Sequence, residues 1–167
     1  VLSVFAQTFN DWELVLVDDG STDSSPQVVD RYRLMDPRRI VSLRQSNRGP
    51  AAAKNAGIRA ARGKYIAFLD SDDILKPNRL ESQIELRRSL TGPIGFIYGG
   101  YEVIEEHGAV VRTVLPDPGL SGDIYEKLWV EEHDISGGTL MVDRDVLSAV
   151  GMFDETLPGS ENRDLRL

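Results

Sequence analysis

The sequence predicts an α/β fold with a doubly wound, mixed but mostly parallel sheet. Strand and helix patterns alternate between residues 12 and 73, in the order strand, helix, strand, helix, strand. The clearest strands are short apolar runs without polar alternation, as in sheets covered on both faces. Two of these runs end in clusters of aspartates. Because open α/β sheets bind ligands at the carboxyl ends of their strands, the same pattern predicts a ligand site.

Composition limits the classes of protein. The 167 residues suit a single domain, with 41% hydrophobic and 28% charged residues. A net charge of -8 without a Lys/Arg cluster argues against nucleic-acid binding. The absence of cysteine excludes disulfides and thiolate metal sites and fits a reducing compartment. The chain begins with Val1, and residues 163–167 resemble the inside of a helix, so we expect a piece cut at both ends.

The first half contains three predicted strands and three predicted helices. Pro26 favours a helix start, Pro37 a helix stop, and six alanines between residues 51 and 61 favour a closely packed helix. The predicted elements are a helix end over 1–9, strands over 12–17, 40–43 and 65–69, and helices from 25 to Pro37 and over 51–61.

The second half is less regular, as expected of a region that lines a variable pocket. A helix is predicted over 78–90, where Leu80 and Ile84 share a face. Strands over 95–104 and 109–114 are predicted to form a hairpin. A short helix over 121–130, a strand over 139–142 and a helix from Asp143 or Asp145 to Gly151 complete the prediction.

The central feature is the stretch Tyr65-Ile-Ala-Phe-Leu-Asp-Ser-Asp-Asp73, where a buried strand runs into three carboxylates. Three such charges repel one another unless a cation or hydrogen-bond donors meet them. Oxygen ligands without Cys or His nearby suit a hard cation such as Mg2+ or Mn2+. A structural interpretation, as turn formers and caps for the following helix, competes more strongly for Asp73 than for Asp72.

A second pair of carboxylates, Asp18 and Asp19, follows the strand over 12–17. Between the two clusters lies a helix start at Gly49, with Arg48 and Lys54 close by, whose backbone N–H groups could face an anion. Together these groups could hold a nucleotide and its diphosphate, with a metal ion that stabilises a departing diphosphate. Such chemistry also needs a base that activates an incoming hydroxyl.

These segments resemble family 2 glycosyltransferases with the GT-A fold. The matching pieces are Asp18-Asp-Gly-Ser-Thr-Asp23, Asn47-Arg-Gly-Pro-Ala-Ala-Ala-Lys-Asn-Ala-Gly57, the stretch 65–73 and Gly151-Met-Phe-Asp-Glu155 followed by Ser160-Glu-Asn-Arg-Asp-Leu165. Each motif is weak alone, but four in this order cover nearly the whole chain.

The resemblance implies a metal-assisted, inverting transfer of a sugar from a nucleotide-diphosphate donor, with a UDP-sugar favoured. The acceptor would be the hydroxyl of a saccharide or lipid-linked molecule, in bacterial cell-surface polysaccharide or glycoconjugate synthesis. Asp18 and Asp19 would contact the base and ribose. Asp70 and Asp72 match the family's Asp-x-Asp motif, with Asp72 as the direct ligand of Mn2+ or Mg2+.

Weaker assignments follow from the same resemblance. Lys54 would have a structural or phosphate-screening role, against the alternative of a solvated helix face. Gly137 and Gly138 would let the backbone approach the sugar, against the alternative of a plain loop. Residues 1–90 would form the donor-binding half and residues 91–167 the acceptor-side half of one domain. The implied location is cytoplasmic, at the inner face of a membrane in a full-length protein.

Two departures from the family pattern stand out. The chain begins after the family's first strand, which normally lies inside the sheet, so open edges would favour instability, strand exchange or a homo-oligomer. The family usually has Glu-Asp at the catalytic base, whereas this chain reads Glu161-Asn162. Asn is not a useful base at neutral pH. Glu161, favoured here, or Asp164 would take that role, unless Glu161 only caps a helix or the chain is a silent donor-binding module.

Two other enzyme and signalling classes share parts of the pattern. A response-regulator receiver also pairs acidic residues at strand ends, but it needs a late strand that ends in Lys, which is absent here. A nucleotidyltransferase could use the same sheet and metal, but its Gly- and Arg-rich phosphate loop would precede the residues present. Both stay less favoured alternatives.

Overall fold

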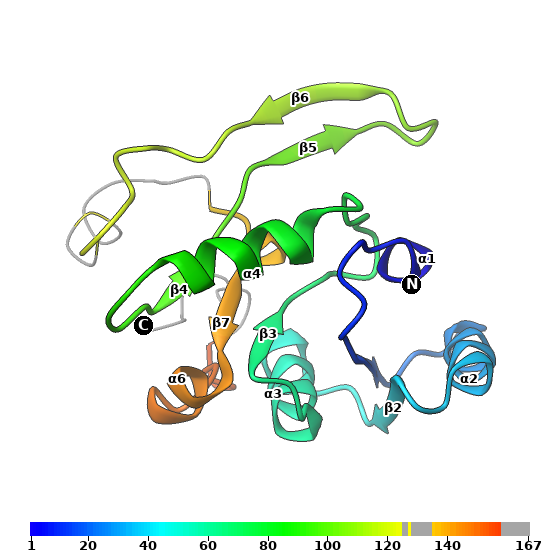
Figure 1. Cartoon of the computed structure of the whole chain (residues 1–167). Helices are drawn as coiled ribbons and strands as arrows, with labels where there is room; N and C mark the ends of the chain where they lie inside the picture. Colours follow the sequence, from blue (N-terminus) through cyan, green and yellow to red (C-terminus); the bar gives the residue numbers. More distant parts are fainter. Residues whose placement is uncertain (125–126, 128–134, 158–167) are drawn as a thin grey trace.

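A computed structural model describes residues 1–124, 127 and 135–157 and has the predicted mixed α/β class (Figure 1). The helices are α1 (Leu2–Phe5), α2 (Ser25–Met35), α3 (Pro50–Ala60), α4 (Arg79–Ser89), α6 (Arg144–Ala149) and the 3-10 turn η1 (Gly137–Thr139). The strands are β1 (Leu14–Asp19), β2 (Ile40–Gln45), β3 (Tyr65–Ala67), β4 (Phe96–Ile97), β5 (Tyr101–Ile104), β6 (Val110–Val114) and β7 (Met141–Asp143).

The described strands form three sheets. Strands β1 and β2 pair in parallel, with Leu14 opposite Ile40 and Asp19 opposite Gln45, and α2 connects them. Strand β7 lies between β3 and β4 and is antiparallel to both. Strands β5 and β6 form an antiparallel hairpin, which lies along the top of Figure 1. Within the described residues, β3 is not hydrogen-bonded to β1 or β2, so the predicted alternation of strands and helices does not close into one continuous sheet there.

Several predicted elements differ in extent from the observed ones. The apolar run 65–69 contributes only three strand residues, because the chain leaves the β7 edge after Ala67. The strand predicted over 95–104 is divided into β4 and β5 by Gly99-Gly100. A Cβ on Gly100 would lie 2.5 Å from the Val114 carbonyl oxygen, so glycine permits this close crossing of the chain. Residues 121–124, the predicted start of the helix over 121–130, are not helical, and residues 125, 126 and 128–130 lie outside the described residues.

Strand β7 divides the hydrophobic core into two parts, because its successive side chains point to opposite faces. Val142 packs on one face with Ile58, Phe68, Leu147 and Phe153. On the other face Met141 packs with Ile84 from α4 and Ile97 from β4. The central strand of this sheet therefore holds helices on both faces.

Helix α3 packs closely against the β1–β2 sheet and against the sheet of β3, β7 and β4. Ala51, Ala52, Asn55 and Ile58 are its buried residues. On one side, an ideal Cβ at Gly57 would lie 3.5 Å from Val17 Cγ2 of β1, an ordinary packing distance. On the other side, Ala51 and Ile58 join the core around Val142. Figure 1 shows α3 between the β1–β2 pair and the sheet that contains β3 and β7.

Hydrogen bonds made by the buried side chain of Gln7 connect the N-terminal segment to the start of α4. Its Nε2 atom donates to the carbonyl oxygens of Ser3 at 3.1 Å and Lys76 at 2.8 Å. Its Oε1 atom accepts from Leu80 N at 3.1 Å, which satisfies one of the free amides at the helix start. Along the described parts of the chain, no helix combines the length and the apolar character that crossing a membrane requires.

Candidate functional site

Asp18 lies at the carboxyl end of β1 and is buried, with 6% of its surface exposed. Its Oδ1 atom accepts a hydrogen bond from Ser21 N at 2.9 Å. Its Oδ2 atom lies 3.1 Å from Arg44 Nε, an ion pair in which the N–H is not aligned for a hydrogen bond. The hydrogen bonds from Ser21 lower the pKa of Asp18 below its ordinary value, and Arg44 lowers it further. Asp18 is therefore charged at neutral pH.

Asp19 is bound to the loop that precedes α3. Its Oδ1 atom accepts from Gln45 Nε2 at 2.8 Å and from Arg48 N at 3.0 Å, and its Oδ2 atom accepts from Gly49 N at 2.8 Å. Burial raises the pKa of Asp19, but these hydrogen bonds lower it more, so the net pKa is below the ordinary value. Both carboxylate oxygens thus have partners within the protein, and Asp19 orders the loop that leads into α3.

Gly20 brings the turn after β1 against that same loop. Its φ of +78° lies in the left-handed region, and a Cβ there would lie 2.6 Å from Asn47 N. Only glycine fits both conditions. The turn after β1 therefore lies directly against the loop before α3.

The second acidic cluster follows β3. Asp70, Asp72 and Asp73 are all exposed, and Asp73 N donates to the Asp70 carbonyl oxygen at 3.2 Å, which closes a turn. Partial burial raises the pKa of Asp73 above its ordinary value, and the charges of Asp70 and Asp72 raise it further. This cluster contrasts with Asp18 and Asp19, whose pKa values are lowered by hydrogen-bond donors.

Arg79 lies beneath this turn, at the start of α4. Its guanidinium donates to the carbonyl oxygens of Phe68 at 3.1 Å and Leu140 at 3.2 Å. These two hydrogen bonds connect the residue after β3 to the residue before β7. Burial lowers the pKa of Arg79 to about 10, although Asp73 opposes this shift. Arg79 remains charged at neutral pH. Arg79 was not predicted from the sequence, because a single arginine at a helix start has no distinctive pattern.

Gly137 and Gly138 form the η1 turn directly against the acidic cluster. A Cβ on Gly138 would lie 2.9 Å from Asp73 Oδ2, so the glycine allows the turn and the carboxylate to approach. Gln83 Nε2 donates to the Thr139 carbonyl oxygen at 2.8 Å and holds the turn from below. The fold therefore brings two predicted site segments, residues 70–73 and 137–138, into contact.

Lys54 lies on α3 and faces the segment that follows α6. Its Nζ atom is 5.6 Å from the ring centroid of Phe153, a cation–π geometry. Glu161, Asn162 and Asp164 lie outside the described residues, so their predicted roles as base and base substitutes stay predictions.

The donor chemistry of the acidic turn suits a hard divalent cation. Asp70, Asp72 and Asp73 offer carboxylate oxygens, and the pKa of Asp73 is raised by partial burial and then by the charges of Asp70 and Asp72, which a cation would offset. Among the described residues, no three His, Cys, Asp or Glu side chains come together to hold a metal ion by themselves. Mg2+ sites with one or two carboxylates commonly use substrate phosphates and water as the remaining ligands, and these residues fit that kind of site.

The pKa of Asp73 leads to a prediction about stability. A raised pKa means that the folded chain binds this proton more tightly than the unfolded chain does, so stability falls as pH rises from the unfolded to the folded pKa. In EDTA, Asp73→Asn should therefore raise the melting temperature at pH 7 and leave it unchanged near pH 3. Asp30→Asn, at an exposed position on α2, is the control. A lower melting temperature than the parent at pH 7 would show that Asp73 stabilises the turn instead.

The family sequence model described as Glycosyl transferase family 2 matches residues 1–151. A relative from Escherichia coli named "UDP-Glc:alpha-D-GlcNAc-diphosphoundecaprenol beta-1,3-glucosyltransferase WfgD" is 35% identical over 151 residues, which covers 89% of this chain and 55% of the relative. An "Uncharacterized glycosyltransferase" from Rickettsia bellii is 34% identical over 165 residues, which covers 98% of this chain and 24% of the relative. The chain therefore spans between about a quarter and about half of these relatives.

The fold is also similar to solved structures. TarS from S. aureus in complex with UDP-GlcNAc superposes with a TM-score of 0.65 at 21% sequence identity, over 98% of this chain and 46% of that chain. The complex of TarS with UDP gives a TM-score of 0.64 over 97% of this chain and 47% of that chain. At this level of identity the likeness concerns the fold. Together with the match over residues 1–151, it confirms the resemblance drawn from the motifs: the chain belongs to glycosyl transferase family 2.

Proposed function

We propose that this chain is the donor-binding and catalytic part of an enzyme that transfers a sugar from a nucleotide-diphosphate donor, with inversion, to an acceptor hydroxyl. The observation that carries the proposal is the contact between the acidic turn 70–73 and the glycine turn at Gly138, in a chain of this family. Carboxylates that meet the backbone of a half-buried glycine at one point offer a place for a diphosphate beside a sugar.

The proposed roles of the residues follow their surroundings. Asp72 is exposed and would hold a divalent cation together with Asp70. The cation, when bound, would stabilise the negative charge on the departing diphosphate. Asp18 and Asp19 would form the nucleotide end of the site, Asp19 acting largely through the loop that it orders. Gly138, which is half-buried, would lie beside the sugar together with the buried Gly137, and Lys54, whose ammonium lies over the Phe153 ring, would have a structural role.

Donor and acceptor are assigned here by analogy with similar proteins. UDP is the proposed nucleotide, since TarS was solved with UDP and with UDP-GlcNAc, and the name of WfgD specifies UDP-Glc. The name of WfgD also specifies a diphosphoundecaprenol-linked sugar, so a lipid-linked saccharide is the proposed acceptor class. Such a reaction belongs to polysaccharide or glycoconjugate assembly. Residues 1–90 would then bind the donor, while residues 91–167 would face the acceptor.

The experiment that tests the proposal is UDP release from UDP-sugars, with Mg2+ or Mn2+ and with EDTA. Asp72→Ala should lower the metal-dependent rate by about 100-fold or more, because it removes a ligand needed to stabilise the leaving diphosphate. Asp30→Ala, on the exposed face of α2, should keep the parent rate. Equal rates for the parent and Asp72→Ala would remove the metal role from this residue.

A second candidate function is a donor-binding module without transfer activity, and Asn162 is the observation that favours it. An amide cannot take a proton from an acceptor hydroxyl at neutral pH. If the base position is vacant, Asn162→Asp should raise the rate of sugar transfer by about 100-fold, the usual contribution of a general base. An unchanged rate in a parent that is already active would assign the base to Glu161 or Asp164. A parent that binds UDP but never consumes the donor would support the silent module.

A further inference from the structure

The side chain of Asn55 binds the backbone of Phe153 in both directions. Asn55 lies in the middle of α3 and only 2% of its surface is exposed. Its Nδ2 atom donates to the Phe153 carbonyl oxygen at 2.9 Å, and its Oδ1 atom accepts from Phe153 N at 3.0 Å. The amide thus pairs with a chain segment 98 residues away much as a neighbouring strand would. A side chain that satisfies both groups must carry a donor and an acceptor side by side, as the amides of Asn and Gln do.

The same amide also binds the side chain of Glu155. The second N–H of Nδ2 reaches Glu155 Oε1 at 3.0 Å, while an Arg48 guanidinium nitrogen donates to Oε2 at 2.7 Å. The hydrogen bond from Asn55 and the charges of Arg48 and Arg59 keep the pKa of Glu155 below its ordinary value. Glu155 is therefore an anion that two arginines and one amide hold against α3.

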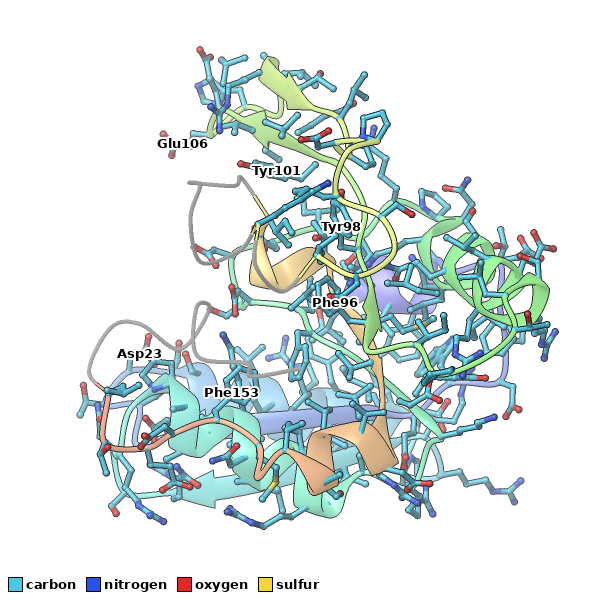
Figure 2. All side chains as sticks on the ribbon, turned by 90° about the vertical axis from the view of Figure 1, so that its left-hand side faces the viewer. Asp23, Phe96, Tyr98, Tyr101, Glu106 and Phe153 are labelled. Atoms are coloured by element: carbon cyan, nitrogen blue, oxygen red, sulfur yellow. The ribbon has the colours of Figure 1, made fainter. Side chains whose placement is uncertain are left out.

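These contacts fix the segment 153–155 relative to both acidic clusters. The Phe153 ring packs edge to face on Phe68 at a centroid distance of 5.5 Å, and Phe68 lies two residues before Asp70. Figure 2 shows Phe153 in the lower part of the molecule, beside α3. Arg48 binds Glu155 with its side chain and Asp19 with its backbone N–H. Arg48 therefore connects Glu155 to the Asp19 loop, which the hydrogen bonds from Gly49 N and Gln45 Nε2 to Asp19 hold independently of Glu155.

We propose that Asn55 is a positioning residue for the acceptor-side segment of the enzyme. It would touch neither donor nor acceptor, but it would hold residues 153–155 in register with the donor site through Phe153 and Glu155. This inference rests on the proposed function, because Glu161, the favoured base, follows Glu155 by six positions in the sequence. A misplacement of reacting groups by about 1 Å is enough to lower a rate by about 100-fold.

Asn55→Asp tests the proposal with a change of almost no volume. The new carboxylate has no N–H for the Phe153 carbonyl, and it places a second negative charge next to Glu155 Oε1. We expect kcat for sugar transfer to fall by about 10- to 100-fold, while the Kd for UDP with Mg2+, measured by calorimetry, stays within about twofold of the parent. Asn78→Asp, the same chemical change at an exposed position whose side chain makes no cap hydrogen bond, should leave both quantities unchanged.

A second substitution checks that the effect passes through Glu155. In Asn55→Asp combined with Glu155→Gln, the introduced glutamine amide can donate to the introduced aspartate, so part of the lost kcat should return. An unchanged kcat in Asn55→Asp would overturn the proposal. Parallel losses of kcat and of UDP affinity would also overturn it, because they would make Asn55 a residue of general stability. A parent protein that consumes no UDP-sugar would instead overturn the proposed function on which this inference rests.

Discussion

The packing of α3 against two separate sheets is the constraint on which the rest of the described structure depends. Strand β1 and strand β3 share no backbone hydrogen bonds within the described residues, so side chains connect the two sheets there. Helix α3 provides much of this connection through small residues such as Ala51 and Ala52 on its buried face. Small side chains allow the helix to approach both sheets, and Ile58 fills the core that also contains Val142 and Leu147.

The two acidic clusters differ in how their charges are compensated. One is stabilised by hydrogen-bond donors of the protein itself, and the other is not. Asp18 and Asp19 accept hydrogen bonds from backbone amides and polar side chains, which lower their pKa values. Asp73 instead has a raised pKa, because partial burial and two neighbouring carboxylates disfavour its charge. The first pair is stabilised from within the protein and organises the loop before α3. The turn over 70–73 is the cluster that we propose binds a divalent cation.

The elements that could be predicted are those whose conformation depends on residues close together in the sequence. The apolar runs before Asp18 and Asp70, the alanines of α3 and the Gly-containing hairpin loop all depend on neighbouring residues, and each led to an element of the correct type. The division of the strand predicted over 95–104 depends on how closely Gly100 approaches Val114, which neighbouring residues do not reveal.

The residues of the candidate site also fall into those that sequence motifs predict and those that only long-range contacts reveal. Asp18, Asp19, Asp70 and Asp72 stand in recognisable motifs, so sequence reasoning named them. Arg79 acts through the distant carbonyl oxygens of Phe68 and Leu140, and Asn55 acts through Phe153. Such long-range contacts leave no spacing pattern in a single sequence. Asn55 does lie within the motif 47–57, but the motif does not indicate that its side chain points toward the segment after α6.

The central claim is that this chain holds a nucleotide-diphosphate site that depends on a divalent cation. Calorimetric titration of the protein with UDP, GDP and dTDP and their sugars, each with Mn2+ and with EDTA, tests it directly. The account predicts that UDP and a UDP-sugar bind with a Kd in the micromolar range in Mn2+, and at least about tenfold more weakly in EDTA. Binding of none of these nucleotides in Mn2+, by protein whose fold is intact, would contradict it.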